Sequence, residues 1–178
     1  MKSKGLILTI ILLAGLGLIA YSLSQREGKE EEPAAVAGLP APKIEVSDAL
    51  NGKELSQSEF KNKVVFVNFW ASWCDPCREE MPSIERLAQH FKNNQDFQIL
   101  TILFRDDPKN GISFLNQNGL DLPLMIDKGG ETAKSYGLTG VPETYIIDKK
   151  GILKKKIIGP YEWYSAEVIE FISGLLKE

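Results

Sequence analysis

The most regular hydrophobic pattern in the chain begins with an apolar run and passes into a helical repeat. Residues 64–69 read VVFVNF, and a run rich in β-branched and aromatic residues predicts a strand covered on both faces. Over residues 75–93 the apolar positions recur every three or four residues, which predicts an amphipathic helix. The apolar stripe of that helix consists of Met81, Ile84, Leu87, Ala88 and Phe91.

The rest of the chain after this pair alternates between strand-like and helix-like segments. Strands are predicted at residues 97–104 and 122–126, and as a hairpin at residues 143–147 and 152–158. Helices are predicted over residues 109–118, 131–136 and 165–176. This order predicts an α/β domain in which a central mixed sheet is flanked by helices.

Before residue 64 the pattern predicts three different kinds of segment. Residues 43–55 alternate around Asn51-Gly52, a two-residue turn signal, and so predict an N-terminal β-hairpin extension. Residues 25–42 are first charged and then rich in Pro, Ala and Gly, which indicates a solvated linker. The domain organisation is therefore an N-terminal segment (residues 1–24), a linker (25–42) and a folded domain (43–178).

The N-terminal segment has the properties of a membrane anchor. Residues 5–24 carry no charge over 20 positions, which as a helix spans the hydrocarbon core of a bilayer. Lys2 and Lys4 precede this stretch, so the N-terminus is expected to stay in the cytoplasm and the domain to face the extracytoplasmic (periplasmic or outer) side. The competing interpretation is a cleaved signal peptide. We favour a single uncleaved transmembrane helix, because the apolar region is long and lacks a clear cleavage site.

Composition excludes several classes of function. The formal net charge of −3 gives no basic excess, so nucleic acid is not an expected partner. Cys74 and Cys77 are the only two cysteines, which rules out a disulfide framework or a four-cysteine zinc site within one chain. His90 is the single histidine, so a Cys–His catalytic pair or a two-histidine metal site would depend on it alone, and no resident metal site is expected.

The two cysteines lie where the predicted strand gives way to the predicted helix. Backbone N–H groups and the macrodipole at a helix N-terminus favour negative charge, so they stabilise a Cys74 thiolate. A thiolate is the nucleophile of disulfide exchange, and Cys77 lies one turn on, where it can close a disulfide with Cys74. We therefore predict a redox-active pair in which Cys74 attacks and Cys77 resolves.

Two stretches resemble the thioredoxin superfamily, and within it the membrane-anchored TlpA/ResA/CcmG (DsbE) branch. They are FWASWCDPCREEMP at residues 69–82 and GLTGVPETYIID at residues 137–148. The resemblance covers about residue 43 to the C-terminus and implies a thioredoxin fold. It also implies a protein-disulfide reductase that needs no cofactor and works outside the cytoplasmic membrane.

The resemblance further implies the partners of such a reductase. Its substrate would be apocytochrome c, whose haem-attachment cysteines must be reduced, which places the chain in cytochrome c maturation. Its electrons would come from a membrane thiol carrier of the CcdA/DsbD type. Two alternatives stay open: a TlpA-like reductant of another extracytoplasmic target such as a copper-site protein, and a non-enzymatic metal chaperone that uses both thiolates as ligands.

The residues between the cysteines are expected to tune their pKa values. Pro76 suits the first helical turn, where its missing N–H costs nothing. Asp75 places a negative charge beside the thiolates, which raises a thiol pKa and favours a more reducing couple. Asp75 could equally be an ordinary carboxylate at a helix start.

Glu80 is a charged residue on the apolar side of the predicted helix. It aligns with Ile84, Leu87 and Phe91 and follows Cys77 by three positions. Burial would raise the pKa of this carboxyl, so that it could pass a proton to or from a cysteine. The resemblance also assigns a tuning role to a glutamate at this position. The competing interpretation is a boundary residue with its carboxylate in water.

The resemblance assigns substrate binding to residues around the second stretch. Val141-Pro142 resembles the cis-proline loop of the family, which packs against the cysteine pair and presents backbone to the substrate. Glu143 follows this loop and is expected to contact the substrate, unless it is a carboxylate exposed at the start of a strand. Trp73 is expected to form part of the apolar surface around Cys74.

Overall fold

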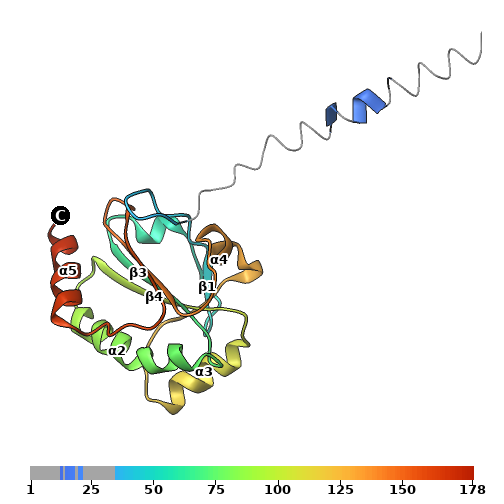
Figure 1. The fold of residues 1–178 in the computed structure, drawn as a ribbon. Coiled ribbons are helices and arrows are strands. Elements are labelled where there is room, and N and C mark those ends of the chain that lie inside the picture. The colour runs from blue at the N-terminus through green and yellow to red at the C-terminus, as the bar shows by residue number, and fades with distance from the viewer. Residues whose placement is uncertain (1–12, 14, 19, 22–34) are drawn as a thin grey trace, which may run out of the picture. The chain divides into compact units, whose positions relative to one another are not determined.

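A seven-stranded mixed sheet is the framework on which the cysteine pair is placed (Figure 1). The computed structural model describes residues 13, 15–18, 20, 21 and 35–178. Its strands are β1 (Val46–Asp48), β2 (Glu54–Leu55), β3 (Val64–Trp70), β4 (Phe97–Leu103), β5 (Leu124–Ile126), β6 (Glu143–Ile147) and β7 (Leu153–Ile158). The helices are η1 (Gln57–Phe60), α2 (Asp75–Phe91), α3 (Pro108–Gln117), η2 (Lys128–Gly130), α4 (Glu131–Ser135) and α5 (Ala166–Lys177).

The strand order is β2-β1-β5-β4-β3-β6-β7. Strands β3, β4 and β5 run parallel, whereas β6 is antiparallel to β3 and β7 is antiparallel to β6. The predicted α/β domain with a thioredoxin-like mixed sheet is confirmed. The strand that precedes the cysteines, β3, lies inside the sheet and is buried along its whole length, because the sheet is covered on both faces.

Alternate residues of β3 serve two separate hydrophobic cores. Val64, Phe66 and Trp70 face the core formed with α2, α3 and α5. Val65, Val67 and Phe69 face a second core, to which α4, η1 and the N-terminal extension contribute. The predicted apolar stripe of α2 lies in the first core, which fixes the face that the helix turns toward the sheet.

The N-terminal hairpin extends the sheet beyond β5. Strand β1 pairs antiparallel with both β2 and β5, so the predicted extension is confirmed. Its turn is longer than the predicted two residues: residues 49–52 form it, and the Asp48 carboxylate accepts hydrogen bonds from the N–H groups of Leu50 and Asn51. Gly52 adopts a φ of 71°, which explains the glycine there.

The folded domain begins before the predicted boundary at residue 43. Part of the expected linker packs on β7: the Gly38 N–H donates to the Leu153 carbonyl over 2.7 Å, and Pro40 forms a bridge with Ile152. Ala35 is buried in the second core. Backbone hydrogen bonds along the edge of a strand thus order residues that composition alone marked as a linker.

The predicted membrane anchor lies mostly outside the described residues. Most of residues 1–24, and residues 25–34 of the linker, lie outside the described residues. Across the part of the chain that is described, no helix is both long and apolar enough to cross a membrane.

Candidate active site

The two cysteines form a disulfide at the start of α2. Cys74 is the N-cap residue of the helix, and its Sγ accepts a hydrogen bond from the Cys77 N–H over 3.2 Å. The Cα atoms are 5.3 Å apart. Cys74 is 6 % exposed and Cys77 is fully buried, so Cys74 is the sulfur that a protein substrate can reach. This geometry fits the predicted roles of attacking and resolving cysteine.

The residues between the cysteines occupy the first helical turn. Pro76 is in this turn, where an N–H is not needed. Asp75 is exposed and pairs with Arg78 over 3.1 Å. Arg78 offsets part of the Asp75 charge, which weakens the expected effect of Asp75 on the thiol pKa values. That effect stays a prediction.

The loop before β6 packs against the disulfide. The Val141–Pro142 peptide bond is cis, as the resemblance implied. The Val141 carbonyl oxygen lies 3.6 Å from Cys74 Sγ, and the Pro142 carbonyl accepts a hydrogen bond from the Gly159 N–H over 2.9 Å. This loop therefore borders the more accessible sulfur, although its predicted contact with a substrate chain stays a prediction.

Trp73 lies on the surface next to Cys74. Its side chain is 59 % exposed, and its Nε1 donates to the Arg105 carbonyl over 3.3 Å. Ser72 donates both its backbone N–H and its hydroxyl to Asp106 Oδ2, over 2.7 and 2.6 Å. The loop after β4 thus fixes the two residues that precede Cys74.

Asp106 is a site residue that sequence reasoning missed. Partial burial acts to raise the pKa of its carboxyl, but hydrogen bonds from Ser72, Asn110 and Asp107 hold that pKa below its usual value. The sequence gives no signal for this contact, because 34 positions separate Ser72 from Asp106.

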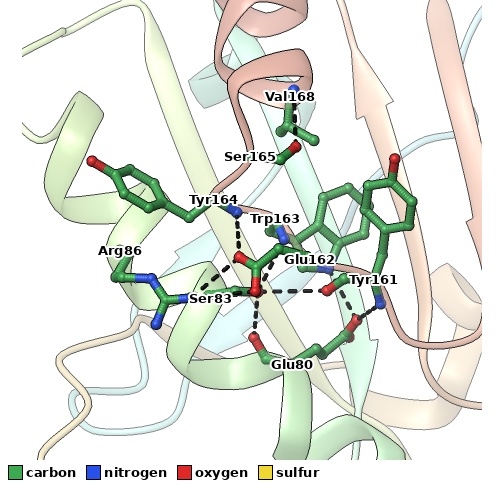
Figure 2. A network of polar contacts seen from close by, with 9 residues as sticks. All are labelled: Glu80, Ser83, Arg86, Tyr161, Glu162, Trp163, Tyr164, Ser165 and Val168. Carbon is green, nitrogen blue, oxygen red and sulfur yellow. Dashed lines mark hydrogen bonds and ion pairs between the residues drawn. The ribbon is translucent and has the colours of Figure 1, made fainter.

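The Glu80 carboxylate is buried beneath the segment that joins β7 to α5. Glu80 is 3 % exposed, which confirms its predicted place on the apolar face of α2. Oε2 accepts hydrogen bonds from Trp163 Nε1 over 2.9 Å and from the Tyr161 N–H over 3.0 Å (Figure 2). Burial raises the pKa of Glu80, and these hydrogen bonds offset only part of the rise.

Further polar contacts hold the Tyr161–Trp163 segment on α2, as Figure 2 shows. Ser83 Oγ accepts a hydrogen bond from the Trp163 N–H over 3.0 Å and donates to the Glu80 carbonyl over 2.8 Å. At the surface, Arg86 pairs with Glu162 over 3.2 Å. The donors to Glu80 therefore have fixed positions, although they come from a distant part of the chain.

Asn68 is the third donor to Glu80, and sequence reasoning did not select it. Its Nδ2 lies 2.8 Å from Glu80 Oε1 and 2.8 Å from Thr144 Oγ1. A signal for it existed, since Asn68 is the only polar residue in the VVFVNFW run of β3.

Glu143 does not occupy the predicted place on the substrate surface. It is fully buried, and its Oε1 accepts hydrogen bonds from the Thr139 N–H and hydroxyl over 3.0 and 2.6 Å. Its Oε2 accepts a hydrogen bond from Tyr145 over 2.6 Å and pairs with Lys156 over 3.3 Å. The strand register turns this side chain into the second core. Glu143 therefore holds the loop through its hydrogen bonds with Thr139 and does not contact the substrate directly.

The charge of Glu143 is retained in this buried place. Burial acts to raise its pKa, but hydrogen bonds from Thr139 and Tyr145 and the nearby charge of Lys156 hold the pKa below its usual value. Glu143 is therefore a carboxylate at neutral pH.

Comparisons with known proteins agree with this site. The Redoxin family profile matches residues 36–168. The chain belongs to the Redoxin family. It is 37 % identical over 161 residues to the thiol-disulfide oxidoreductase ResA of Bacillus thuringiensis subsp. konkukian, covering 89 % of this chain and 90 % of the relative. ResA of Geobacillus thermodenitrificans is 35 % identical over 151 residues, covering 85 % of each chain.

Solved structures of this Redoxin-family fold include a thiol:disulfide interchange protein from Chlorobium tepidum. It superposes with a TM-score of 0.68 at 26 % identity and covers 80 % of this chain and 99 % of that one. Together with the named relatives, it places the chain in the ResA/CcmG-like branch of the thioredoxin superfamily and makes it a thiol:disulfide oxidoreductase. The Cys74–Cys77 disulfide is present at the predicted redox site, and its role as attacking and resolving cysteine stays a prediction.

Proposed function

We propose that the chain is a membrane-tethered protein-disulfide reductase that acts outside the cytoplasm, with apocytochrome c as its substrate. The observation that carries the proposal is the buried Glu80 carboxylate one helical turn after a cysteine pair that caps a helix. A reductase must lose thiol protons as it passes electrons to its substrate, and in this proposal Glu80 accepts one.

The reaction uses two electrons from the dithiol. The Cys74 thiolate attacks one sulfur of the substrate disulfide, which forms a mixed disulfide and releases the other sulfur as a thiolate. Glu80 accepts the Cys77 proton. The Cys77 thiolate then attacks the Cys74 sulfur, so the second substrate sulfur leaves and the Cys74–Cys77 disulfide forms. The released thiolates take up protons, and a membrane thiol carrier of the CcdA/DsbD type restores the dithiol.

The substrate is proposed to lie across Trp73 and the Val141-Pro142 loop. Trp73 offers an exposed apolar ring, and Val141 offers backbone beside Cys74 Sγ. A cavity of about 640 Å³ is lined by Arg105, whose carbonyl accepts a hydrogen bond from Trp73, and by Leu138, which precedes the loop, but Trp73 and the loop do not line it.

The direction of electron flow is tested by the reduction potential, measured on the full chain in detergent with defined thiol buffers. A value near or below roughly −230 mV supports a reductase, and a value near roughly −120 mV contradicts it and indicates an oxidant. If no reversible couple is found, binding of Zn²⁺ or Cu⁺ to the reduced protein tests the metal-chaperone alternative.

The substrate is tested by trapping. The Cys77→Ser variant is expected to hold a mixed disulfide between Cys74 and an oxidised apocytochrome c peptide with a CxxCH segment, and Cys74→Ser is the matched control. A copper-site protein trapped in preference to this peptide would support the TlpA-like alternative and contradict the assignment to cytochrome c.

The tether is tested separately. We propose that residues 5–24 stay attached and span the membrane, because the stretch is uncharged and follows two lysines. The full chain is then expected in the membrane fraction, with the domain open to protease from the extracytoplasmic side. A mature N-terminus that begins after this stretch would show a cleaved signal instead.

A further inference from the structure

Asn68 lies in an inner strand of the sheet, and one of its polar atoms has no hydrogen-bond partner. It is fully buried in β3, on the face that meets α2. Both of its hydrogen bonds are made by Nδ2, to Glu80 and to Thr144. Within residues 35–178, Asn68 Oδ1 and Trp70 Nε1 are the buried side-chain nitrogen or oxygen atoms that have no hydrogen-bond partner.

An unpaired acceptor at this depth is costly. Burying a polar group without a partner costs on the order of 1–3 kcal/mol, and most buried polar side-chain atoms are paired. A leucine would fill a similar volume without that cost. The asparagine therefore calls for an explanation that includes the unpaired oxygen.

The hydrogen-bond partners of Glu80 provide an explanation for the unpaired oxygen of Asn68. The carboxylate accepts from Asn68 Nδ2, Trp163 Nε1 and the Tyr161 N–H, and all three are donors. These contacts suit the ionised form. A protonated carboxyl also carries an O–H, which needs an acceptor. Asn68 Oδ1 is an acceptor with no other partner, on a side chain that already touches Glu80 Oε1.

We propose that Asn68 is a positioning residue for the proton of Glu80, because its amide donates to the carboxylate and, after a half-turn, accepts from the protonated carboxyl. The half-turn exchanges the places of Nδ2 and Oδ1. Oδ1 then faces Glu80 Oε1 and Thr144 Oγ1, both of which can donate as hydroxyl groups. Glu80 thus keeps a hydrogen bond to Asn68 in both protonation states.

The proton comes from the resolving cysteine. When the Cys77 thiol gives its proton to the Glu80 carboxylate, a thiolate and a neutral carboxyl form, and no net charge is created in the core. Cys77 lies one turn before Glu80 on the same buried face of α2. The other packed elements present Asn68 from β3, Thr144 from β6, and Tyr161 and Trp163 from the segment before α5. Glu80 forms no ion pair with a described lysine or arginine.

The two orientations of the Asn68 amide are not equally stable. After the half-turn the two N–H groups of Asn68 face the place where Oδ1 is now unpaired, so the protonated state leaves donors without partners. This cost favours return of the proton once the Cys77 thiolate has reacted. Asn68 therefore makes the protonated state of Glu80 accessible and short-lived, which suits a proton carrier in repeated turnover.

The direct test is NMR spectroscopy of the reduced full chain in detergent, labelled with 15N-asparagine. Above the pH at which Glu80 titrates, the Asn68 side-chain amide protons are expected to show nuclear Overhauser contacts with Thr144. Below that pH these contacts are expected to be lost, with the same midpoint as the Glu80 carboxyl carbon. In Glu80→Gln, whose side-chain amide donates like a protonated carboxyl, the contacts should be absent at every pH. Contacts that persist through the Glu80 titration would overturn the proposal.

A kinetic test uses Asn68→Leu, with Thr101→Val as the matched control. Thr101 is also fully buried in the sheet, but its hydroxyl donates to the Pro123 carbonyl. Loss of one hydrogen bond, to the carboxylate or to the protonated carboxyl, corresponds to a rate loss of about five- to ten-fold. Disulfide reduction by Asn68→Leu is expected to slow by this factor both above and below the pH midpoint of Glu80. Thr101→Val is expected to keep the wild-type pH profile. A higher midpoint with no loss on the acidic side would show that Asn68 only donates.

The proposal rests on the proposed role of Glu80 as a proton carrier, and the two fail in different ways. If Glu80→Gln keeps the wild-type rate and pH profile, the role of Glu80 is wrong. If Glu80→Gln removes the pH dependence while the Asn68 amide does not turn, only the role of Asn68 is wrong.

Discussion

Trp163 Nε1 lies 2.9 Å from Glu80 Oε2, although the two residues are 83 positions apart. The indole ring also packs edge-on against Phe66, with the ring centroids 4.8 Å apart. Packing therefore holds the ring whether or not the hydrogen bond forms. The polar and apolar functions of Trp163 can be separated by a substitution that keeps an aromatic ring.

Trp163→Phe is expected to raise the pKa of Glu80 further, because the indole N–H stabilises the carboxylate. Loss of one hydrogen bond to a charged group corresponds to a rise of about one pKa unit. The midpoint of the pH dependence of disulfide reduction should move up by that amount. Tyr161→Phe is the control, since it keeps the backbone N–H that donates to Glu80. An unchanged midpoint in Trp163→Phe would contradict this account.

Glu80→Gln is expected to separate activity from stability. General acid–base groups contribute about 10²-fold or more to a rate, so reduction of a peptide disulfide should slow by about that factor. The raised pKa of Glu80 means that the folded protein takes up this proton at a higher pH than the unfolded chain. The contribution of Glu80 to stability is therefore fully present below the unfolded pKa and is lost as pH rises through the folded pKa.

The glutamine cannot ionise and does not suffer this loss. Relative to the wild type, the free energy of unfolding of Glu80→Gln should rise as pH increases through the folded pKa of Glu80. Urea denaturation of the reduced proteins at pH 4 and pH 8 measures this. A difference between the two proteins that is the same at both pH values would show that the Glu80 pKa is not raised by folding.

Lys156→Met is expected to destabilise the protein through the buried Glu143. Removing one partner of a fully buried ion pair costs about 3–5 kcal/mol, and because Lys156 is partly exposed we expect about 2 kcal/mol. Lys155→Met is the control, since the exposed pair of Lys155 with Glu167 should contribute no more than about 1 kcal/mol. Urea denaturation at pH 7 distinguishes the two, and equal losses would argue against a special role of Lys156.

The Glu143–Lys156 pair predicts that the free energy of unfolding falls as the pH is lowered, which is opposite to the effect of Glu80. The pKa of Glu143 is depressed, so its stabilisation is present above the unfolded pKa and is lost as pH falls through the folded pKa. The gap between Lys156→Met and the wild type should therefore narrow in acid. A constant gap down to the acid transition would show that Lys156 does not contribute to the depressed pKa of Glu143, which the hydrogen bonds from Thr139 and Tyr145 lower most.

Sequence patterns predict the parts of this site that are local in the chain. The strand β3, the helix α2, the cysteines at their junction and the burial of Glu80 all follow from residues within a few turns of each other. The donors to Glu80 could not be predicted, because Tyr161 and Trp163 reach it only through the packing of the segment before α5. The direction of Glu143 depends on the register of β6, and a carboxylate directly after the loop fits either face of a strand until its partners are known.

The contact between Ser72 and Asp106 provides the last prediction. Asp106→Ala removes both hydrogen bonds from Ser72 and frees the residues before Cys74, whereas Ser72→Ala removes only the hydroxyl donor. Because Trp73 is proposed to bind substrate, KM for a peptide disulfide should rise about three- to ten-fold in Asp106→Ala and less in Ser72→Ala, since ordering a freed side chain on binding costs about 1 kcal/mol. The depressed pKa of Asp106 means that the contact holds at neutral pH and is lost only as pH falls through the folded pKa. Steady-state kinetics at pH 7 measures the effect, and an unchanged KM in both variants would show that this loop does not position the binding surface.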